Sequence, residues 1–299
     1  MSVTAPRPGA RQLQDLLPAA ADVDAVTLHV GDLEAMTAYY RDALGLVVVD
    51  EGAGLRRLGR GRTVVLVLRH TPGLPRPART QAGLFHTAIL FATESDLAAA
   101  VASAARHPLS RYVGSADHLV SSAFYFTDPE GNGIELYHDR DRSTWQWRDG
   151  QVQMDTLYLD PQAFLRRHLT EAAAGGLAAA PAQVGHVHLQ VGDVDAAHGF
   201  YVDALGFETT ARLPGALFVS AGGYHHHIAV NTWNSRGAGP RASTLGLGAV
   251  TVTVPARADL DAVADRMRHR GVEVADDGRS LTLHDPWRNE VTLALAQAV

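Results

Sequence analysis

Histidine is the residue type that gives this sequence its chemical character. The 299-residue chain contains 15 histidines and no cysteine. Without cysteine there are no disulfides, thiolate metal sites, iron–sulfur clusters or cysteine nucleophiles, so any bound metal must have nitrogen and oxygen ligands. Imidazole is the commonest metal ligand and the commonest general acid or base near neutral pH. The residue types therefore favour metal or acid–base chemistry, and the positions of the histidines decide which.

Composition and charge exclude several classes of function. The chain is 46% hydrophobic and 19% charged, as in ordinary globular proteins, and no apolar stretch is long enough for a membrane helix. A net charge of −6 and scattered arginines argue against nucleic acid as a partner. Residues 1–17 lack the apolar segment of a secretory signal, so we expect a cytoplasmic protein. The length favours two domains.

The chain contains a tandem duplication. Residues 30–46 (VGDLEAMTAYYRDALGL) are echoed by residues 191–207 (VGDVDAAHGFYVDALGF). A second echo pairs residues 128–134 (DPEGNGI) with residues 285–291 (DPWRNEV), late in each half. Similarity of this length at a fixed spacing indicates repeated structural units.

Each half predicts a strand, a helix and further strands, and then the same series again. Asp32 and Asp193 fit N-caps of helices that end near Gly45 and Gly206. The other predicted helices are residues 95–106 and 258–270. Alternating apolar residues predict strands at 25–30, 47–50, 55–58, 63–69, 84–91, 186–191, 216–220, 225–232 and 249–254, with hairpins around 128–132 and 285–289. The sequence therefore predicts an α+β fold of four βαβββ units.

This pattern resembles the vicinal-oxygen-chelate superfamily of glyoxalases, bleomycin-resistance proteins and extradiol dioxygenases, and in particular its catechol 2,3-dioxygenase-like members. The resemblance covers roughly residues 24–295. It implies an N-terminal extension at residues 1–22 and a first vicinal-oxygen-chelate domain at residues 23–140. A linker at residues 141–183 would lead to a second such domain at residues 184–299. Relatives include lyases, epimerases, antibiotic-resistance proteins and dioxygenases, so the site has to indicate the chemistry.

The resemblance implies one metal site. Members of the superfamily carry metal ligands on the first and last strands of their units, and His86, Glu135 and His186 occupy such positions here. Two histidines and one carboxylate form the facial triad typical of non-heme Fe(II), with Mn(II) as the alternative metal.

Neither half of the chain contains a complete ligand set. The positions that match the three ligands in the other half are occupied by Ala25, Ala249 and Thr292. We therefore expect the second unit to pair with the third and to form the metal-bearing barrel, while the first and fourth units form a vestigial one. Two alternatives stay open: completion of the site across a subunit interface, or His29 as a substitute ligand.

The resemblance also implies three catalytic residues beside the metal. Tyr125 has the separation from Glu135 at which extradiol dioxygenases carry a substrate-binding tyrosine. His226 would be the acid–base histidine, and strand alternation would point His225 and His227 to the opposite face, although a slip of one residue would swap the assignment. His118 resembles a second active-site histidine, although its spacing from Glu135 departs slightly from the extradiol pattern.

Two linker segments and one further histidine have alternative interpretations. Residues 143–147 (STWQW) would either wall a substrate pocket or hold the linker in place. Residues 172–180 are rich in small residues and would form either a flexible segment or a weakly specified helix. His188 shares a strand face with His186 and would either support the metal ligands or pack across the strands.

The resemblance implies an extradiol (catechol 2,3-) dioxygenase, an oxidoreductase of aromatic-compound catabolism that opens a diol ring with Fe(II) and O2. The alternatives are a metal-dependent glyoxalase- or epimerase-like lyase and a non-catalytic protein that binds an aromatic drug. Glyoxalase-type relatives usually have an acidic fourth ligand, and residues 63–69 and 225–232 contain no acidic residue. A drug-binding protein needs no metal triad. The sequence names no particular substrate, and it leaves a homo-oligomer open.

Overall fold

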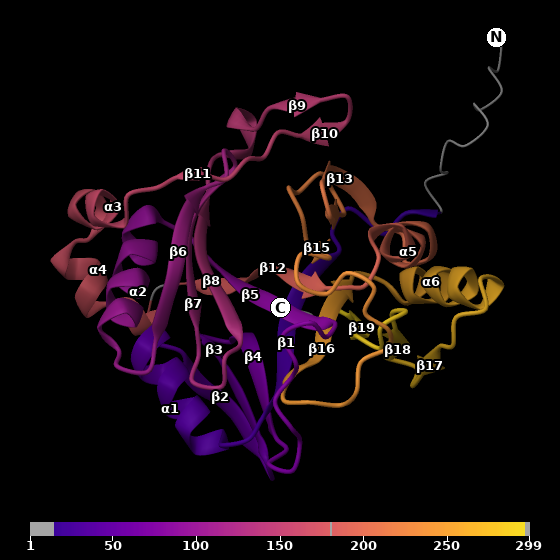
Figure 1. Ribbon diagram of the computed structural model, residues 1–299, viewed down its shortest axis with the longest axis horizontal. Coiled ribbons are helices and arrows are strands. Elements are labelled where there is room, and N and C mark those ends of the chain that lie inside the picture. Colours follow the sequence, from indigo (N-terminus) through magenta and orange to yellow (C-terminus); the bar gives the residue numbers. More distant parts are fainter. Residues whose placement is uncertain (1–14, 180, 297–299) are drawn as a thin grey trace.

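The computed structural model describes residues 15–179 and 181–296 (Figure 1). The first two units contain β1 (Asp22–Val30), α1 (Leu33–Leu44), β2 (Val47–Gly52), β3 (Leu55–Arg60), β4 (Thr63–His70), β5 (Gly83–Phe91), α2 (Glu94–Arg106), β6 (Arg111–Asp117), β7 (Ser121–Thr127) and β8 (Gly133–Asp139). The last two contain β12 (Ala182–Gln190), α5 (Val194–Ala197), the π-helix η4 (His198–Ala204), β13 (Glu208–Leu213), β14 (Ala216–Ser220), β15 (Ile228–Asn231), β16 (Gly246–Val254), α6 (Arg257–His269), β17 (Ala275–Asp276), β18 (Ser280–His284) and β19 (Glu290–Leu295). The predicted α+β fold of four βαβββ units is confirmed.

The segment between the halves carries more structure than a simple linker. It contains β9 (Trp147–Arg148), β10 (Gln151–Val152), β11 (Leu157–Tyr158), α3 (Pro161–His168) and α4 (Glu171–Gly175). Strand β11 pairs with β6 at the edge of a sheet. The small-residue segment is helical over α4 and forms a 3-10 turn at Leu177–Ala179, while residue 180 lies outside the described residues.

Two sheets combine the four units in a crossed manner. The eight-stranded sheet has the order β17-β18-β19-β16-β1-β4-β3-β2 and therefore joins the first unit to the fourth. The nine-stranded sheet has the order β11-β6-β7-β8-β5-β12-β15-β14-β13 and joins the second unit to the third. The predicted pairing of units is confirmed, whereas the domain boundaries stay a prediction. In Figure 1, α1 and α2 lie on one side of the sheets and α5 and α6 on the other.

Local capping explains where the helices begin and end. The side chain of Asp32 accepts a hydrogen bond from the amide of Ala35, and Asp193 does the same for Ala196. Gly45 ends α1 with a φ of 66°, a left-handed conformation that glycine adopts without a steric penalty. Both predicted N-caps are confirmed. None of the helices in the described residues is long and apolar enough to cross a membrane.

The two repeated motifs are joined by one buried contact in each half. The Tyr40 hydroxyl donates to Asp128 Oδ2 at 2.8 Å, and the Tyr201 hydroxyl donates to Asp285 Oδ2 at 3.0 Å. The other oxygen of Asp128 accepts hydrogen bonds from the backbone amides of Glu130 and Asn132. Each contact ties a helix of one unit to a hairpin of the next. In the first half, this hairpin leads directly into β8 and sets its position.

One strand begins later than predicted. We expected a strand over residues 225–232, but β15 begins at Ile228. The preceding turn contains Gly222 and Gly223, with φ values of 61° and 69°. These left-handed residues break the extended backbone, so the histidines at 225–227 lie in a loop that leads into the strand. Strand alternation therefore does not determine the directions of their side chains.

Candidate metal centre

Strand register brings three ligand-type side chains to one face of the nine-stranded sheet. Strand β5 lies between β8 and β12, and Ala88 on β5 is opposite Glu135 on one side and His186 on the other. Directly opposed residues share a face of a sheet, and His86 shares that face because it lies two positions before Ala88. The small Ala88 side chain leaves space between the three. His86, Glu135 and His186 thus converge within one chain, and none of them is more than 6% exposed.

The distances fit a metal ion of octahedral geometry. Oε2 of Glu135 lies 2.9 Å from Nε2 of His86 and 3.2 Å from Nε2 of His186. Adjacent ligand atoms of an octahedral ion with bonds of about 2.1 Å are about 3.0 Å apart. The Nε2 atom of His86 is buried, and it has no hydrogen-bond partner of acceptable geometry. A buried nitrogen without a partner beside a carboxylate is the arrangement that a bound cation would complete.

The charge states of the triad also suit a cation. Burial lowers the pKa of His186 to about 4, and the neighbouring Glu135 carboxylate only partly offsets this effect. Burial alone would raise the pKa of Glu135, but the interactions with His186 and His86 outweigh it and hold that pKa well below its ordinary value. At neutral pH the His186 imidazole therefore keeps a lone pair on one ring nitrogen and the carboxylate is anionic, as metal binding requires.

A cavity of about 500 Å³ opens beside the triad. Its wall is mostly apolar, and the lining residues include Phe85, Val113, Val120, Phe126, Ile134, Met154, Leu213, Phe218 and Trp233. The polar residues that line it are the triad, the neighbouring histidines and Tyr125, together with Ser121, Thr127, Asp155 and Thr156. Such a combination of apolar wall and convergent polar groups is typical of a small-molecule site.

Tyr125 and His118 lie together on this wall. Tyr125 on β7 is paired in register with Glu135 on β8, which places its ring beside the triad. The Tyr125 hydroxyl is 2.6 Å from Nε2 of His118, and Nδ1 of His118 is 2.7 Å from the carbonyl oxygen of Asp155. Burial, followed by the charge of Glu135, raises the pKa of Tyr125 well above its ordinary value, so the phenol keeps its proton.

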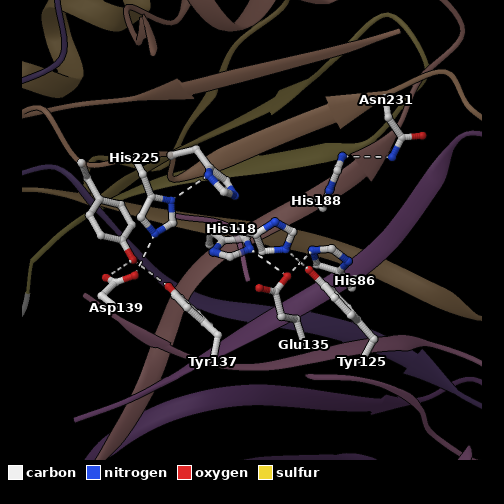
Figure 2. A network of polar contacts seen from close by, with 12 residues as sticks. His86, His118, Tyr125, Glu135, Tyr137, Asp139, His188, His225 and Asn231 are labelled. Atoms are coloured by element: carbon white, nitrogen blue, oxygen red, sulfur yellow. Dashed lines mark hydrogen bonds and ion pairs between the residues drawn. The ribbon is translucent and has the colours of Figure 1, made fainter. Parts of the chain in front are cut away.

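Two other histidines lie close to the triad. His226 lines the cavity, and its ring centroid is 4.1 Å from that of His186. Burial, reinforced by His186 and His225, lowers the pKa of His226 well below its ordinary value. His188 also lines the cavity and lies opposite His86 on the paired strand. Its Nε2 is 2.9 Å from Nδ2 of the Asn231 side chain (Figure 2).

The expectation that His225 points away from the site is wrong. Its Nδ1 lies 2.7 Å from Nδ1 of His226, and the two ring centroids are 4.5 Å apart. The physical reason is the loop conformation of residues 225–227, which does not alternate as a strand would. Sequence reasoning also missed Asp139, whose Oδ1 lies 2.9 Å from Nε2 of His225. The Gly222–Gly223 pair before the histidines was the available signal that the strand begins later.

His29 does not take part in the centre. Among the described residues, the groups of side chains with metal-binding spacing are His86, Glu135 and His186, and His186 with His225 and His226. His29 lies on β1 in the eight-stranded sheet and belongs to neither group. Because the triad meets within one chain, neither a substitute ligand nor a partner subunit is required.

The tryptophan motif holds the linker and does not wall the cavity. Trp145 is buried and packs its ring 5.2 Å from that of His225, while its Nε1 donates to the carbonyl oxygen of Arg140. Trp145 and Trp147 are absent from the residues that line the cavity. The motif therefore supports the back of the loop that carries the two neighbouring histidines.

Comparison with known proteins identifies relatives along most of the chain. The family described as "Glyoxalase/Bleomycin resistance protein/Dioxygenase superfamily" matches residues 22–136 and 183–284. Catechol-2,3-dioxygenase from Bacillus subtilis (strain 168) is 38% identical over 267 residues, which cover 87% of this chain and 92% of that protein. Biphenyl-2,3-diol 1,2-dioxygenase 3 from Rhodococcus globerulus is 33% identical over 125 residues, which cover 38% of this chain and 60% of that protein.

Solved structures share the fold at low sequence identity. Glyoxalase I from Zea mays aligns with a TM-score of 0.56 and 16% identity, over 92% of both chains. The cppA protein from Streptococcus pneumoniae TIGR4 aligns with a TM-score of 0.57 and 12% identity, over 91% of this chain and 98% of that one. Because the family match extends over most of both halves and the Bacillus relative is similar over nearly its full length, this chain belongs to the glyoxalase, bleomycin-resistance protein and dioxygenase superfamily.

Proposed function

We propose that this protein is an extradiol dioxygenase that opens the ring of a catechol-type diol with Fe(II) and O2. One observation carries the proposal: His86, Glu135 and His186 meet on the wall of an apolar cavity that Tyr125 and His226 also line. The relatives named as diol dioxygenases support the same reaction class. Fe(II) is proposed as the native metal over Mn(II), and a cytoplasmic location stays a prediction.

His86, Glu135 and His186 would hold the iron and leave coordination positions open toward the cavity. When bound, Fe(II) supplies a Lewis-acid centre that activates the diol and O2 together. His226 carries the acid–base role, because its neutral imidazole accepts a proton from a diol hydroxyl and later returns it to the ring-opened product. The buried position of the triad keeps water away from the reacting groups.

Hydrogen-bond directions assign a role to Tyr125. A carbonyl oxygen can only accept, so Nδ1 of His118 donates to the carbonyl of Asp155; with one proton on the ring, Nε2 then accepts from the Tyr125 hydroxyl. The tyrosine oxygen then keeps its lone pairs for a hydrogen bond from the substrate. His118 acts through this contact, because it holds the phenol in one orientation at the cavity wall.

The cavity lining indicates which diols would bind. Its residues include no arginine or lysine, and Glu135 and Asp155 are its acidic members. A carboxylate on the substrate would therefore meet no cation to offset its loss of hydration. Catechols with apolar, uncharged substituents fit the wall, and a volume of about 500 Å³ accommodates more than the diol ring itself.

A glyoxalase-like lyase is the less favoured function. That chemistry would be supported by a second carboxylate at the metal. Among the described residues, two groups of side chains have metal-binding spacing, and Glu135 is the one carboxylate in them. Asp155, the other acidic residue of the cavity, uses its Oδ1 to accept from the amide of Thr156. Within the part of the chain that the structure describes, no specific contact favours the lyase.

The test is to load the metal-free protein with Fe(II) without oxygen, admit O2, and follow oxygen uptake and a yellow ring-opened product. The panel contains catechol, 3- and 4-methylcatechol and 3,4-dihydroxybenzoate. His86→Ala and Glu135→Ala should abolish turnover, whereas His269→Ala and Glu171→Ala, matched changes at exposed positions, should not. Parallel loading with Mn(II) compares the metals. Tight iron binding without turnover of any diol would contradict the proposal.

A further inference from the structure

A chain of hydrogen bonds begins at Asp139, the last residue of β8, and passes through His225 (Figure 2) to His226, which lines the cavity. Oδ1 of Asp139 lies 2.9 Å from Nε2 of His225, and Nδ1 of His225 lies 2.7 Å from Nδ1 of His226. The second carboxylate oxygen of Asp139 accepts from the Tyr224 hydroxyl at 2.8 Å. The Tyr224 oxygen is in turn 2.7 Å from the hydroxyl of Tyr137. Both carboxylate oxygens of Asp139 are therefore occupied.

The carboxylate determines the direction of every bond in this chain. An ionised carboxylate can only accept, so Nε2 of His225 carries the proton that it donates to Asp139. With one proton on each ring, Nδ1 of His225 bears the lone pair and accepts from Nδ1 of His226. Since His226 is neutral with its proton on Nδ1, its Nε2 is the nitrogen that remains free for the cavity. Tyr137 likewise donates to Tyr224, which donates to Asp139.

Packing holds the ring of His225, which lies between Asp139 and His226, in place. His225 is 1% exposed, and its ring lies 4.1 Å from that of Tyr224 and 5.2 Å from that of Trp145. The hydroxyl of Thr210 donates to the backbone carbonyl of His225 at 2.5 Å. A ring confined on both faces and at its backbone cannot rotate freely, so it transmits the orientation set by Asp139 to His226.

We propose that Asp139 and His225 are positioning residues that fix the tautomer of His226, with the proton on Nδ1 and the lone pair on the Nε2 that faces the cavity. A general base needs its lone pair directed at the substrate, and the opposite tautomer would present an N–H there instead. The effect on catalysis rests on the proposed dioxygenase function, whereas the tautomer itself does not.

The tautomer can be read without turnover. Metal-free protein with ¹⁵N-labelled histidine would be compared by long-range ¹H–¹⁵N NMR at mildly alkaline pH, with the His226 signals identified by their loss in His226→Ala. We expect an Nδ1-protonated His226 in the wild type and a shift toward the Nε2-protonated form in Asp139→Ala. Tyr224→Phe is the matched control, because it removes the other contact of Asp139 and keeps the bond to His225. An Nε2-protonated wild type, or no change in Asp139→Ala, would overturn the proposal.

Kinetics of the iron-loaded protein test the consequence. We expect kcat of Asp139→Ala to fall by about 10²-fold, with a KM within about threefold of the wild type, because general-base catalysis typically contributes at least that factor. Asp139→Ala combined with His226→Ala should be no slower than His226→Ala alone, since Asp139 acts only through His226. Losses that multiply in the double variant would indicate a general structural role. A wild type that turns over no diol would refute the dioxygenase but leave the NMR result decisive for the tautomer.

Discussion

Burial of His186 should make the metal-free protein sensitive to acid. Burial lowers the pKa of this imidazole from 6.5 to about 4 in the folded state. In the unfolded chain it titrates near its ordinary value, so the unfolded state binds the proton first as the pH falls. The corresponding stability is fully present above about pH 6.5 and is lost as the pH falls through the window toward about pH 4.

The size of the effect follows from these two pKa values. Linkage gives a loss of about 2 kcal/mol in the free energy of unfolding between about pH 7 and about pH 5 for this one group. The full window is worth about 3 kcal/mol, because each pKa unit corresponds to about 1.4 kcal/mol. His188 and His226 act in the same direction, since burial lowers both of their pKa values well below the ordinary value.

Urea unfolding with a chelator present measures this quantity at the two pH values. His186→Gln removes the titrating group. Between the two pH values, the loss in free energy of unfolding should therefore be about 2 kcal/mol smaller for this variant than for the wild type. His269→Gln changes an exposed histidine on α6 and should keep the wild-type dependence. Equal pH dependence in the wild type and His186→Gln would show that the buried imidazole is not held neutral by the fold.

Three further changes probe the site and its support. Glu135→Gln keeps the side-chain shape but removes the anion, and a competition titration should show iron affinity lower by about 10²-fold or more, since even loss of a residue that only orients ligands costs about 10–100-fold. Tyr125→Phe removes one hydrogen bond of about 1 kcal/mol, so kcat/KM should fall by about fivefold with unchanged iron stoichiometry; an unaltered kcat/KM would contradict its role. In Gly133→Ala, the new Cβ would lie 2.0 Å from the Phe85 carbonyl oxygen, so urea unfolding should show a loss of about 1–3 kcal/mol. Gly114→Ala, where a Cβ meets nothing within 4 Å, is its control and should change stability by less than about 0.5 kcal/mol.

Local sequence patterns were sufficient to predict the units and most of their boundaries. Helix caps such as Asp32 and Gly45 act within one turn, and strand periodicity is a property of neighbouring residues. These features were therefore visible before the fold was known. The candidate ligands were visible for a related reason: the duplication aligns each unit with the others, so a histidine or glutamate at the first or last strand stands out against Ala25, Ala249 and Thr292.

How these residues meet depends on contacts between distant parts of the chain. His86, Glu135 and His186 share a face because both neighbouring strands place their ligand opposite Ala88, and that register arises from contacts between residues far apart in the chain. The contact of Asp139 with His225 spans 86 residues and depends on a loop that the strand prediction did not anticipate. Local patterns determine which residues form an element. Long-range packing decides which side chains of different elements come within reach of one metal or one proton.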